Sequence, residues 1–149
     1  MIQRITTITP DIEESISELG KEFYSQSGLK GTFRAQTFVE TWNQLLKVGV
    51  SSMWISRSGG EVTGALGVIL SMHMFDGEVT AQECFWFVRE EHRGLAGPRL
   101  FKAMEEWTKQ IGVTRILMAH LDQAEESAVG TFYERRGFRK LETTYVRDV

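Results

Sequence analysis

The spacing of apolar residues in the first fifty positions predicts a short strand followed by two amphipathic helices. Residues 2–8 fit the strand, and Thr9-Pro10-Asp11 fits a helix start, with a hydroxyl N-cap and proline at the first helical position. Apolar side chains then recur every three or four residues, which is one face of a helix. They are Ile12, Ile16, Leu19 and Phe23 in the first helix, and Phe38, Trp42 and Leu45 in the second, which ends at Gly49.

From residue 51 the apolar period shortens to that of strands. Three strands are predicted, at 51–56, 62–71 and 79–88, with glycine-containing turns at 58–60 and 75–77 between them. Turns this short join antiparallel neighbours, so these strands form a meander.

A helix and a buried strand continue the pattern. Leu100, Met104, Trp107 and Ile111 make one helical face that stops at Gly112. Residues 116–121 form the strand. A strand, a helix and a second strand make a crossover, so strands 79–88 and 116–121 should be parallel neighbours.

The last elements are a helix and two short strands. Asp122 and Glu125 resemble a capping box for a helix that ends at Gly137. Residues 138–139 and 143–147 are expected to close the sheet. These final strands either pair within one chain or exchange between two copies, which would make a homodimer.

Length and composition indicate one domain over residues 1–149. A chain of 149 residues with 42% hydrophobic content can bury a core without disulfides or metals. The element order β-α-α-β-β-β-α-β-α-β-β predicts an α/β (α+β) fold, a mixed central sheet of about six or seven strands flanked by about four helices. Cys84 is the single cysteine, and no Cys/His spacing matches a structural zinc site.

Charge and hydropathy narrow the range of possible binding partners and of cellular compartments. A net charge of −3 argues against nucleic acid. Residues 1–88 carry 6 basic and 10 acidic side chains, and residues 89–149 carry 11 and 10, so the second part better suits an anionic ligand. No run of 18 apolar residues occurs and the N-terminus lacks a signal-peptide core, so we expect a cytoplasmic protein without a membrane partner.

Residues 88–100, VREEHRGLAGPRL, predict an anion site. An apolar strand enters a charged, glycine-containing loop that opens a helix, with Pro98 at the first helical position. Free backbone N–H groups and the helix dipole attract phosphate, and Arg93 and Arg99 add fixed charge. The alternative is an ordinary strand-to-helix connection with solvated arginines.

A second motif stands at residues 131–138, TFYERRGF. With the element order and the anion loop, it resembles the GCN5-related N-acetyltransferase family, a likeness that covers nearly the whole chain. The resemblance implies transfer of an acetyl group from acetyl-coenzyme A to a primary amine of a small molecule or peptide. It places the pantetheine arm between the two parallel strands. The implied cofactor-binding residues are Phe87, Val88, Arg89, Arg93, Gly94, Leu95, Ala96, Gly97 and Arg99.

The resemblance also implies catalytic residues. Tyr133 matches the family's tyrosine that protonates the departing thiolate; its alternative role is core packing, with the hydroxyl on a backbone carbonyl. The Val88 N–H is our candidate for stabilising an oxyanion. Glu83 is similar to a strand carboxylate that some family members use as a base. Strand alternation places it on the face of Phe85 and Phe87, and its alternative role is to reach solvent.

Three alternatives remain open at the level of sequence. His120, with an ordinary pKa of about 6.5, is the rival base. Cys84 with His120 and Asp122 could instead carry the acyl group covalently. A different class of function is a non-catalytic module that binds coenzyme A or a partner in the same groove; binding without turnover would distinguish it.

Overall fold

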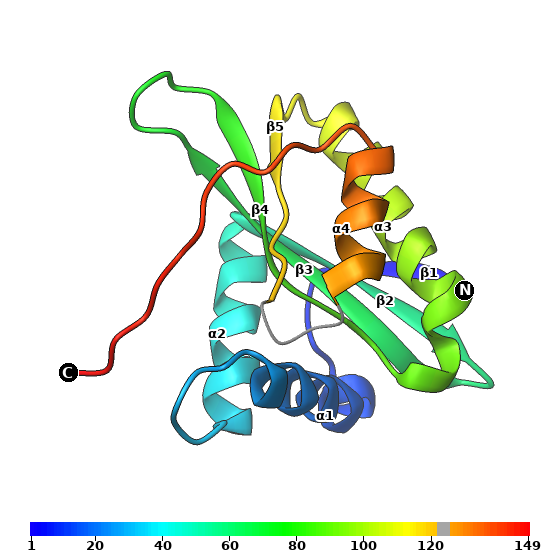
Figure 1. Cartoon of the computed structure of the whole chain (residues 1–149). Helices are drawn as coiled ribbons and strands as arrows, with labels where there is room; N and C mark the ends of the chain where they lie inside the picture. The colour runs from blue at the N-terminus through cyan, green and yellow to red at the C-terminus, as the bar shows by residue number, and fades with distance from the viewer. Residues whose placement is uncertain (122–125) are drawn as a thin grey trace.

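The computed structural model describes residues 1–121 and 126–149, and among these it contains one five-stranded sheet (Figure 1). The strands follow the order of the sequence across the sheet. Neighbours are antiparallel from β1 to β4, and β4 and β5 are parallel, as predicted. The strands are β1 (Ile2–Ile5), β2 (Ser51–Ser58), β3 (Glu61–Met72), β4 (Val79–Val88) and β5 (Arg115–Leu117).

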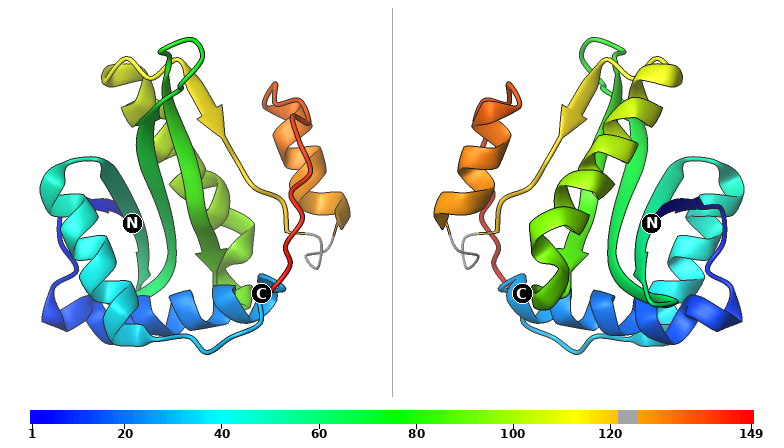
Figure 2. Two further views of the ribbon diagram at one scale, coloured as in Figure 1. Left: turned by 90° about the vertical axis from the view of Figure 1, so that its left-hand side faces the viewer. Right: turned by 90° about the vertical axis from the view of Figure 1, so that its right-hand side faces the viewer.

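Helices cover both faces of the sheet (Figure 2). One face carries α1 (Pro10–Gln26) and α2 (Ala35–Val48), and the other carries α3 (Arg93–Gln110) and α4 (Glu126–Arg135). A short 3-10 turn, η1 (Glu90–His92), joins β4 to α3. Each face of the sheet buries its own hydrophobic cluster, so the sheet separates two hydrophobic cores.

The predicted start of α1 and the predicted end of α2 are confirmed. Thr9 is the N-cap and Pro10 the first residue of α1, although the Thr9 hydroxyl donates to the Asp11 carboxylate and accepts no hydrogen bond from a backbone N–H of the helix. Gly49 ends α2 with a φ of +78°, a left-handed conformation that glycine adopts without strain.

An irregularity in β4 changes which face its side chains occupy. Glu83 pairs with Val68 and Phe85 pairs with Gly67, so Cys84 is an extra residue, a β-bulge. Paired residues share a face, and Val68 belongs to the α3–α4 core whereas Phe85 belongs to the α1–α2 core. The prediction that Glu83 shares a face with Phe85 and Phe87 was therefore wrong.

The bulge also marks where β4 and β5 separate. Their parallel pairing covers only residues 80–82 of β4, opposite residues 115–117. Beyond it the two chains diverge, as Figure 2 shows for the yellow strand leaving the green one. In the described chain, residues 84–88 thus have a strand neighbour on the β3 side alone. The strand predicted at 116–121 is shorter than expected for the same reason.

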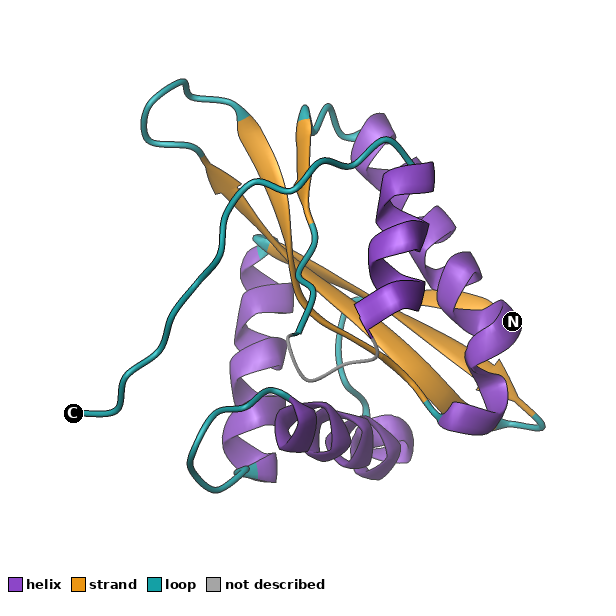
Figure 3. Ribbon diagram, in the orientation of Figure 1, coloured by secondary structure: helices purple, strands orange, loops and turns teal. Residues whose placement is uncertain are grey.

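The two final strands predicted at 138–139 and 143–147 are not formed in the structure. Phe138 packs against the α3–α4 core, but the following residues extend away from the sheet (Figure 3). Tyr145 is 91% and Val146 68% exposed, so the apolar side chains of this segment are not buried against the sheet. The helix before it ends near Gly137, whose φ is +82°, as predicted. The capping box proposed for Asp122 and Glu125 lies outside the described residues.

No helix in the described part of the chain combines the length and the apolar character that crossing a membrane requires.

Candidate active site

The connection from β4 to α3 is helical where a loop was predicted. The 3-10 turn η1 leads straight into α3, which begins at Arg93. Pro98 is therefore the sixth residue of the helix and not the first, which corrects the sequence prediction. Because proline has no N–H, the Gly94 carbonyl lacks its normal partner.

The early helix start changes which amides face a ligand. In a helix that begins at Arg93, the N–H groups of Ala96 and Gly97 point to carbonyls of the preceding turn. Those of Gly94 and Leu95 point out of the N-terminus. A side chain at Gly94 would meet nothing within 4 Å, and Leu95 is 68% exposed, so this end is open. Gly97 is buried on the opposite side of the helix, where a Cβ would lie 3.5 Å from Trp86.

The three arginines of this region have different surroundings. Arg93 donates from Nε to the Val88 carbonyl at 3.1 Å, and its guanidinium lies 5.7 Å from the centre of the Phe87 ring. Arg89 binds Glu18 of α1 at 2.8 Å. Arg99 is exposed on α3. Arg93 is therefore the first residue of α3, Arg99 lies more than one turn further along the helix, and Arg89 is turned toward α1.

The outer edge of β4 presents backbone groups to the gap beside β5. The Arg89 N–H bonds to the Thr63 carbonyl of β3. Strand groups alternate between edges, so the N–H and C=O of Val88 point the other way, where Arg93 meets the carbonyl. The Val88 N–H faces the gap, as its expected part in binding an extended ligand requires.

Glu83 and Tyr133 meet at one residue across this gap. The Glu83 carboxylate accepts a hydrogen bond from the Ala119 N–H at 2.9 Å, and the Tyr133 hydroxyl donates to the Ala119 carbonyl at 2.8 Å. Glu83 is 7% exposed and Tyr133 9%. The structure thus brings together two residues that lie fifty positions apart in the sequence.

Burial shifts the pKa of both groups. It raises the pKa of Glu83 to about 7, although the hydrogen bond from Ala119 acts in the opposite direction. Burial, with the nearby Glu83 charge, also raises the pKa of Tyr133. At neutral pH Tyr133 therefore keeps its proton, whereas Glu83 can exchange one.

Tyr133 also packs within an aromatic cluster. Its ring lies 5.5 Å from Phe138, 6.1 Å from Phe132 and 6.4 Å from Trp86, between centroids. The hydroxyl on a backbone carbonyl is the arrangement expected of core packing. Protonation of a departing thiolate would require the hydroxyl to exchange this hydrogen bond for one to the sulfur.

His120 and Cys84 are placed differently. His120 is exposed, three residues beyond the end of β5 and beside Gly130 of α4. Cys84 as a residue is exposed at the bulge, but its thiol is partly desolvated, and this, with the nearby Glu83 charge, raises its pKa to about 11 and disfavours the nucleophilic thiolate. Asp122, the third member of the covalent alternative, lies outside the described residues.

Two participants in the site were missed at the level of sequence. Ala119 acts through its backbone, which no side-chain pattern could have indicated. Trp86 lies between α3 and α4, and its indole N–H is buried without a hydrogen-bond partner in residues 1–121 and 126–149. Because Trp86 stands between Phe85 and Phe87, the local sequence held no signal of a polar role.

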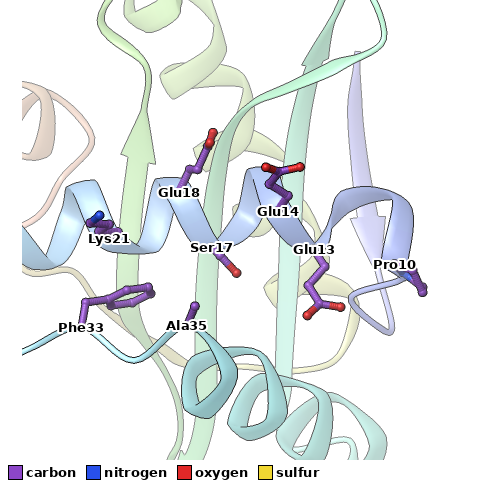
Figure 4. Close-up of a pocket in the computed structure, with 8 residues that line it drawn as sticks. All are labelled: Pro10, Glu13, Glu14, Ser17, Glu18, Lys21, Phe33 and Ala35. Atoms are coloured by element: carbon purple, nitrogen blue, oxygen red, sulfur yellow. The ribbon is translucent and has the colours of Figure 1, made fainter.

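Surface hollows lie along α1, away from Glu83 and Tyr133. The first has a volume of about 560 Å³ between α1 and the start of α2 (Figure 4). Glu13 and Ser17 point toward the start of α2, and Glu14 and Glu18 leave α1 on the other side. A second hollow shares Glu18 with it and reaches Arg89. The first hollow is lined by three carboxylates and one cationic side chain, Lys21, and would attract cations, whereas the second is lined by two of each.

Comparison with known proteins identifies the class. The family model of the GNAT acetyltransferases matches residues 14–138, so the chain belongs to this family. Acetyl-coenzyme A is the acyl donor of the family, which confirms the predicted co-substrate. The free β4 edge and the open helix end at Gly94 suit its extended arm and its phosphates.

Solved structures share the fold. A probable acetyltransferase has a TM-score of 0.77 at 14% identity, and the comparison covers 100% of this chain and 97% of that one. Ribosomal-protein-alanine N-acetyltransferase from Brucella melitensis gives 0.71 at 12%, over 100% and 99%. An aminoglycoside N-acetyltransferase in complex with coenzyme A gives 0.73 at 14%, over 100% and 93%. No curated protein matches the chain.

Proposed function

We propose that this protein transfers an acetyl group from acetyl-coenzyme A directly to a primary amine of a small molecule or a peptide. The observation that carries the proposal is the meeting of Glu83 and Tyr133 where β4 and β5 separate. Family membership supplies the donor. The acceptor is inferred from charge: the carboxylates along α1 favour a cationic amine.

The donor is proposed to lie along the free edge of β4. The Val88 N–H would bind it as a further strand would be bound, and would stabilise negative charge on the acetyl oxygen. The amides of Gly94 and Leu95, with Arg93 and Arg99, would hold its phosphates. While binding a phosphate, Arg93 would either keep its hydrogen bond to the Val88 carbonyl or exchange it for one to the phosphate. Phe87, Arg89, Ala96 and Gly97 complete the predicted set.

The chemistry needs an acid and a base. As the carbon–nitrogen bond forms and the carbon–sulfur bond breaks, the sulfur keeps the electron pair and Tyr133 gives it a proton. A base takes the proton that the amine loses, and solvent returns a proton to the phenolate. Glu83, whose pKa is about 7, and the exposed His120 are the candidates for the base.

Calorimetric titration with acetyl-coenzyme A tests the proposal. We expect a dissociation constant in the micromolar range, which corresponds to a binding free energy of about −8 kcal/mol. Arg93→Ala and Arg99→Ala should each weaken binding by about 1.5 to 3 kcal/mol because a charged hydrogen bond to phosphate is lost. Arg4→Ala on β1, at the far edge of the sheet, is the control and should bind as the unchanged protein does.

Turnover is then measured by thiol release with a panel of amines. Suitable acceptors are a polyamine, an aminoglycoside and a peptide that begins with alanine, the last two because of the structural neighbours. Binding without turnover on any amine would favour the non-catalytic module. A folded protein that does not bind acetyl-coenzyme A would refute the proposal.

A further inference from the structure

The Ala119 peptide is held from two sides by residues of different elements. Glu83 on β4 accepts from its N–H, and Tyr133 on α4 donates to its carbonyl. Ala119 itself lies in the segment that follows β5, beyond the last residue paired with β4. The two hydrogen bonds therefore form one continuous bridge across the gap between β4 and α4.

The bulge at Cys84 is what makes this bridge. It places Glu83 opposite Val68, on the α3–α4 face where Tyr133 lies. In a regular strand, Glu83 would follow Phe85 to the α1–α2 face and could not reach Ala119. The carboxylate is thus directed at the backbone that carries the acceptor for Tyr133.

Burying a carboxylate so that it accepts a hydrogen bond from one amide costs free energy. Burial penalises its charged form, and the hydrogen bond from Ala119 offsets part of that penalty. In return, a charged acceptor binds an N–H more strongly than a neutral one. The segment after β5 has ended its ladder, so Glu83 is a strong constraint on the position of Ala119.

We propose that Glu83 is a positioning residue for Tyr133: by fixing the Ala119 peptide, it fixes the carbonyl that holds the phenol hydroxyl, and so the place beside the gap from which the phenol gives its proton. This inference rests on the proposed acetyl transfer, in which Tyr133 protonates the departing sulfur. It assigns Glu83 an action through the backbone, separate from any proton that Glu83 takes from the amine.

Two substitutions of similar size separate positioning from proton acceptance. Glu83→Gln keeps an oxygen that can accept from Ala119 but cannot take a proton at neutral pH, whereas Glu83→Met has neither ability. Positioning predicts that kcat of Glu83→Met falls at least tenfold below that of Glu83→Gln, with KM for acetyl-coenzyme A within about threefold. If the two variants are equally slow, Glu83 acts as a base alone and the proposal is overturned.

A double-mutant cycle provides the second kinetic test. If Glu83 positions Tyr133, the difference in kcat between Glu83→Met and Glu83→Gln disappears when both are made in the Tyr133→Phe background. A tenfold difference that persists in that background would overturn the proposal. Ala119→Pro removes the N–H while keeping the carbonyl, and should reproduce the loss of Glu83→Met; it also serves if Glu83→Met does not fold.

Glu78→Ala is the matched control. Glu78 is another carboxylate that joins the β3–β4 hairpin to the start of β5, where it accepts from the Thr114 hydroxyl. It lies at the other end of the β4–β5 pairing from Tyr133. Its removal should leave kcat unchanged; a loss equal to that of Glu83→Met would show that any loosening of β5 slows the reaction, and would overturn the specific role of Glu83.

One measurement needs no turnover. NMR of protein labelled at the tyrosine ζ-carbon gives three signals, one of which Tyr133→Phe assigns. We expect Glu83→Met, but neither Glu83→Gln nor Glu78→Ala, to shift the Tyr133 signal strongly. An unmoved signal in Glu83→Met overturns the proposal. If the unchanged protein acetylates no amine, the proposed function fails and this experiment alone decides whether Glu83 positions Tyr133.

Discussion

The Nε atom of Arg93 donates a hydrogen bond to the Val88 carbonyl oxygen, 3.1 Å away, at the junction of β4 and α3. The guanidinium also lies over the Phe87 ring. One side chain therefore joins the end of the strand to the start of the helix, at the residues that we propose for donor binding.

Replacement of Arg93 by lysine should separate this structural contact from charge. Lysine keeps the positive charge but has no Nε donor close to the backbone. We expect the free energy of unfolding to fall by about 0.5 to 1.5 kcal/mol, the value of one hydrogen bond, measured by urea denaturation. An unchanged stability would show that the bond to Val88 contributes nothing.

The buried Glu83 carboxyl should make stability depend on pH. Its pKa of about 7 lies above the ordinary value of 4.5, so the folded state binds more protons than the unfolded state between these values. Stability from this group is therefore full below about pH 4.5 and falls as the pH rises to about 7. The whole change is on the order of 3 kcal/mol. Glu83→Gln should remove this slope in denaturation curves from pH 4 to 8, whereas Glu78→Gln should leave it.

Replacement by alanine should have opposite effects on the free energy of unfolding at two glycines. At Gly67, where β3 passes Phe85, a Cβ would lie 2.6 Å from both the Phe85 and Trp42 rings. Gly67→Ala should therefore lower the free energy of unfolding by about 1 to 3 kcal/mol through overpacking. At Gly97 the nearest atom is 3.5 Å away, and alanine favours a helix by about 0.5 to 1 kcal/mol. Urea denaturation of both variants checks the pair, and equal effects would contradict these contacts.

The exposed C-terminal segment should contribute little to stability. Leu141, Tyr145 and Val146 are all more than half exposed. Deletion of residues 141–149 should change the free energy of unfolding by less than about 0.5 kcal/mol, measured by denaturation. A loss above about 1 kcal/mol would mean that the segment packs in solution, within its own chain or on a second copy. Sedimentation of both proteins distinguishes these cases.

Periodicity predicted most of the fold because it reports directly on burial. The stripe of Ile12, Ile16 and Leu19 indicated α1, and these side chains are buried as expected. The same reasoning predicted the final strands, which are not formed. Residues 143–147 have the composition of a strand, but in the structure they contact no apolar partner. Strand preference depends on such neighbours, which a local pattern does not contain. The cytoplasmic location, the homodimer and the absence of a nucleic-acid partner stay predictions.

The candidate site was predicted as a set of residues, but not as an arrangement. Glu83 and Tyr133 were both found, one from a carboxylate in an apolar strand and one from the motif at 131–138. Their link through Ala119 could not be, because a backbone hydrogen bond leaves no mark on the side chain. The helix start at Arg93 was missed because Pro98 usually marks a first turn, and here η1 had already begun the winding.

The extra residue in β4 has a consequence for how this protein can change over generations. Loss of the single codon for Cys84 would return β4 to regular pairing, with Glu83 and Phe85 as adjacent residues that still lie opposite Val68 and Gly67. Adjacent strand residues point to opposite faces, so Glu83 would stay in the compartment of Tyr133 and Phe85 in that of α1 and α2. An in-frame deletion at this position thus straightens the strand without moving the carboxylate to the other core.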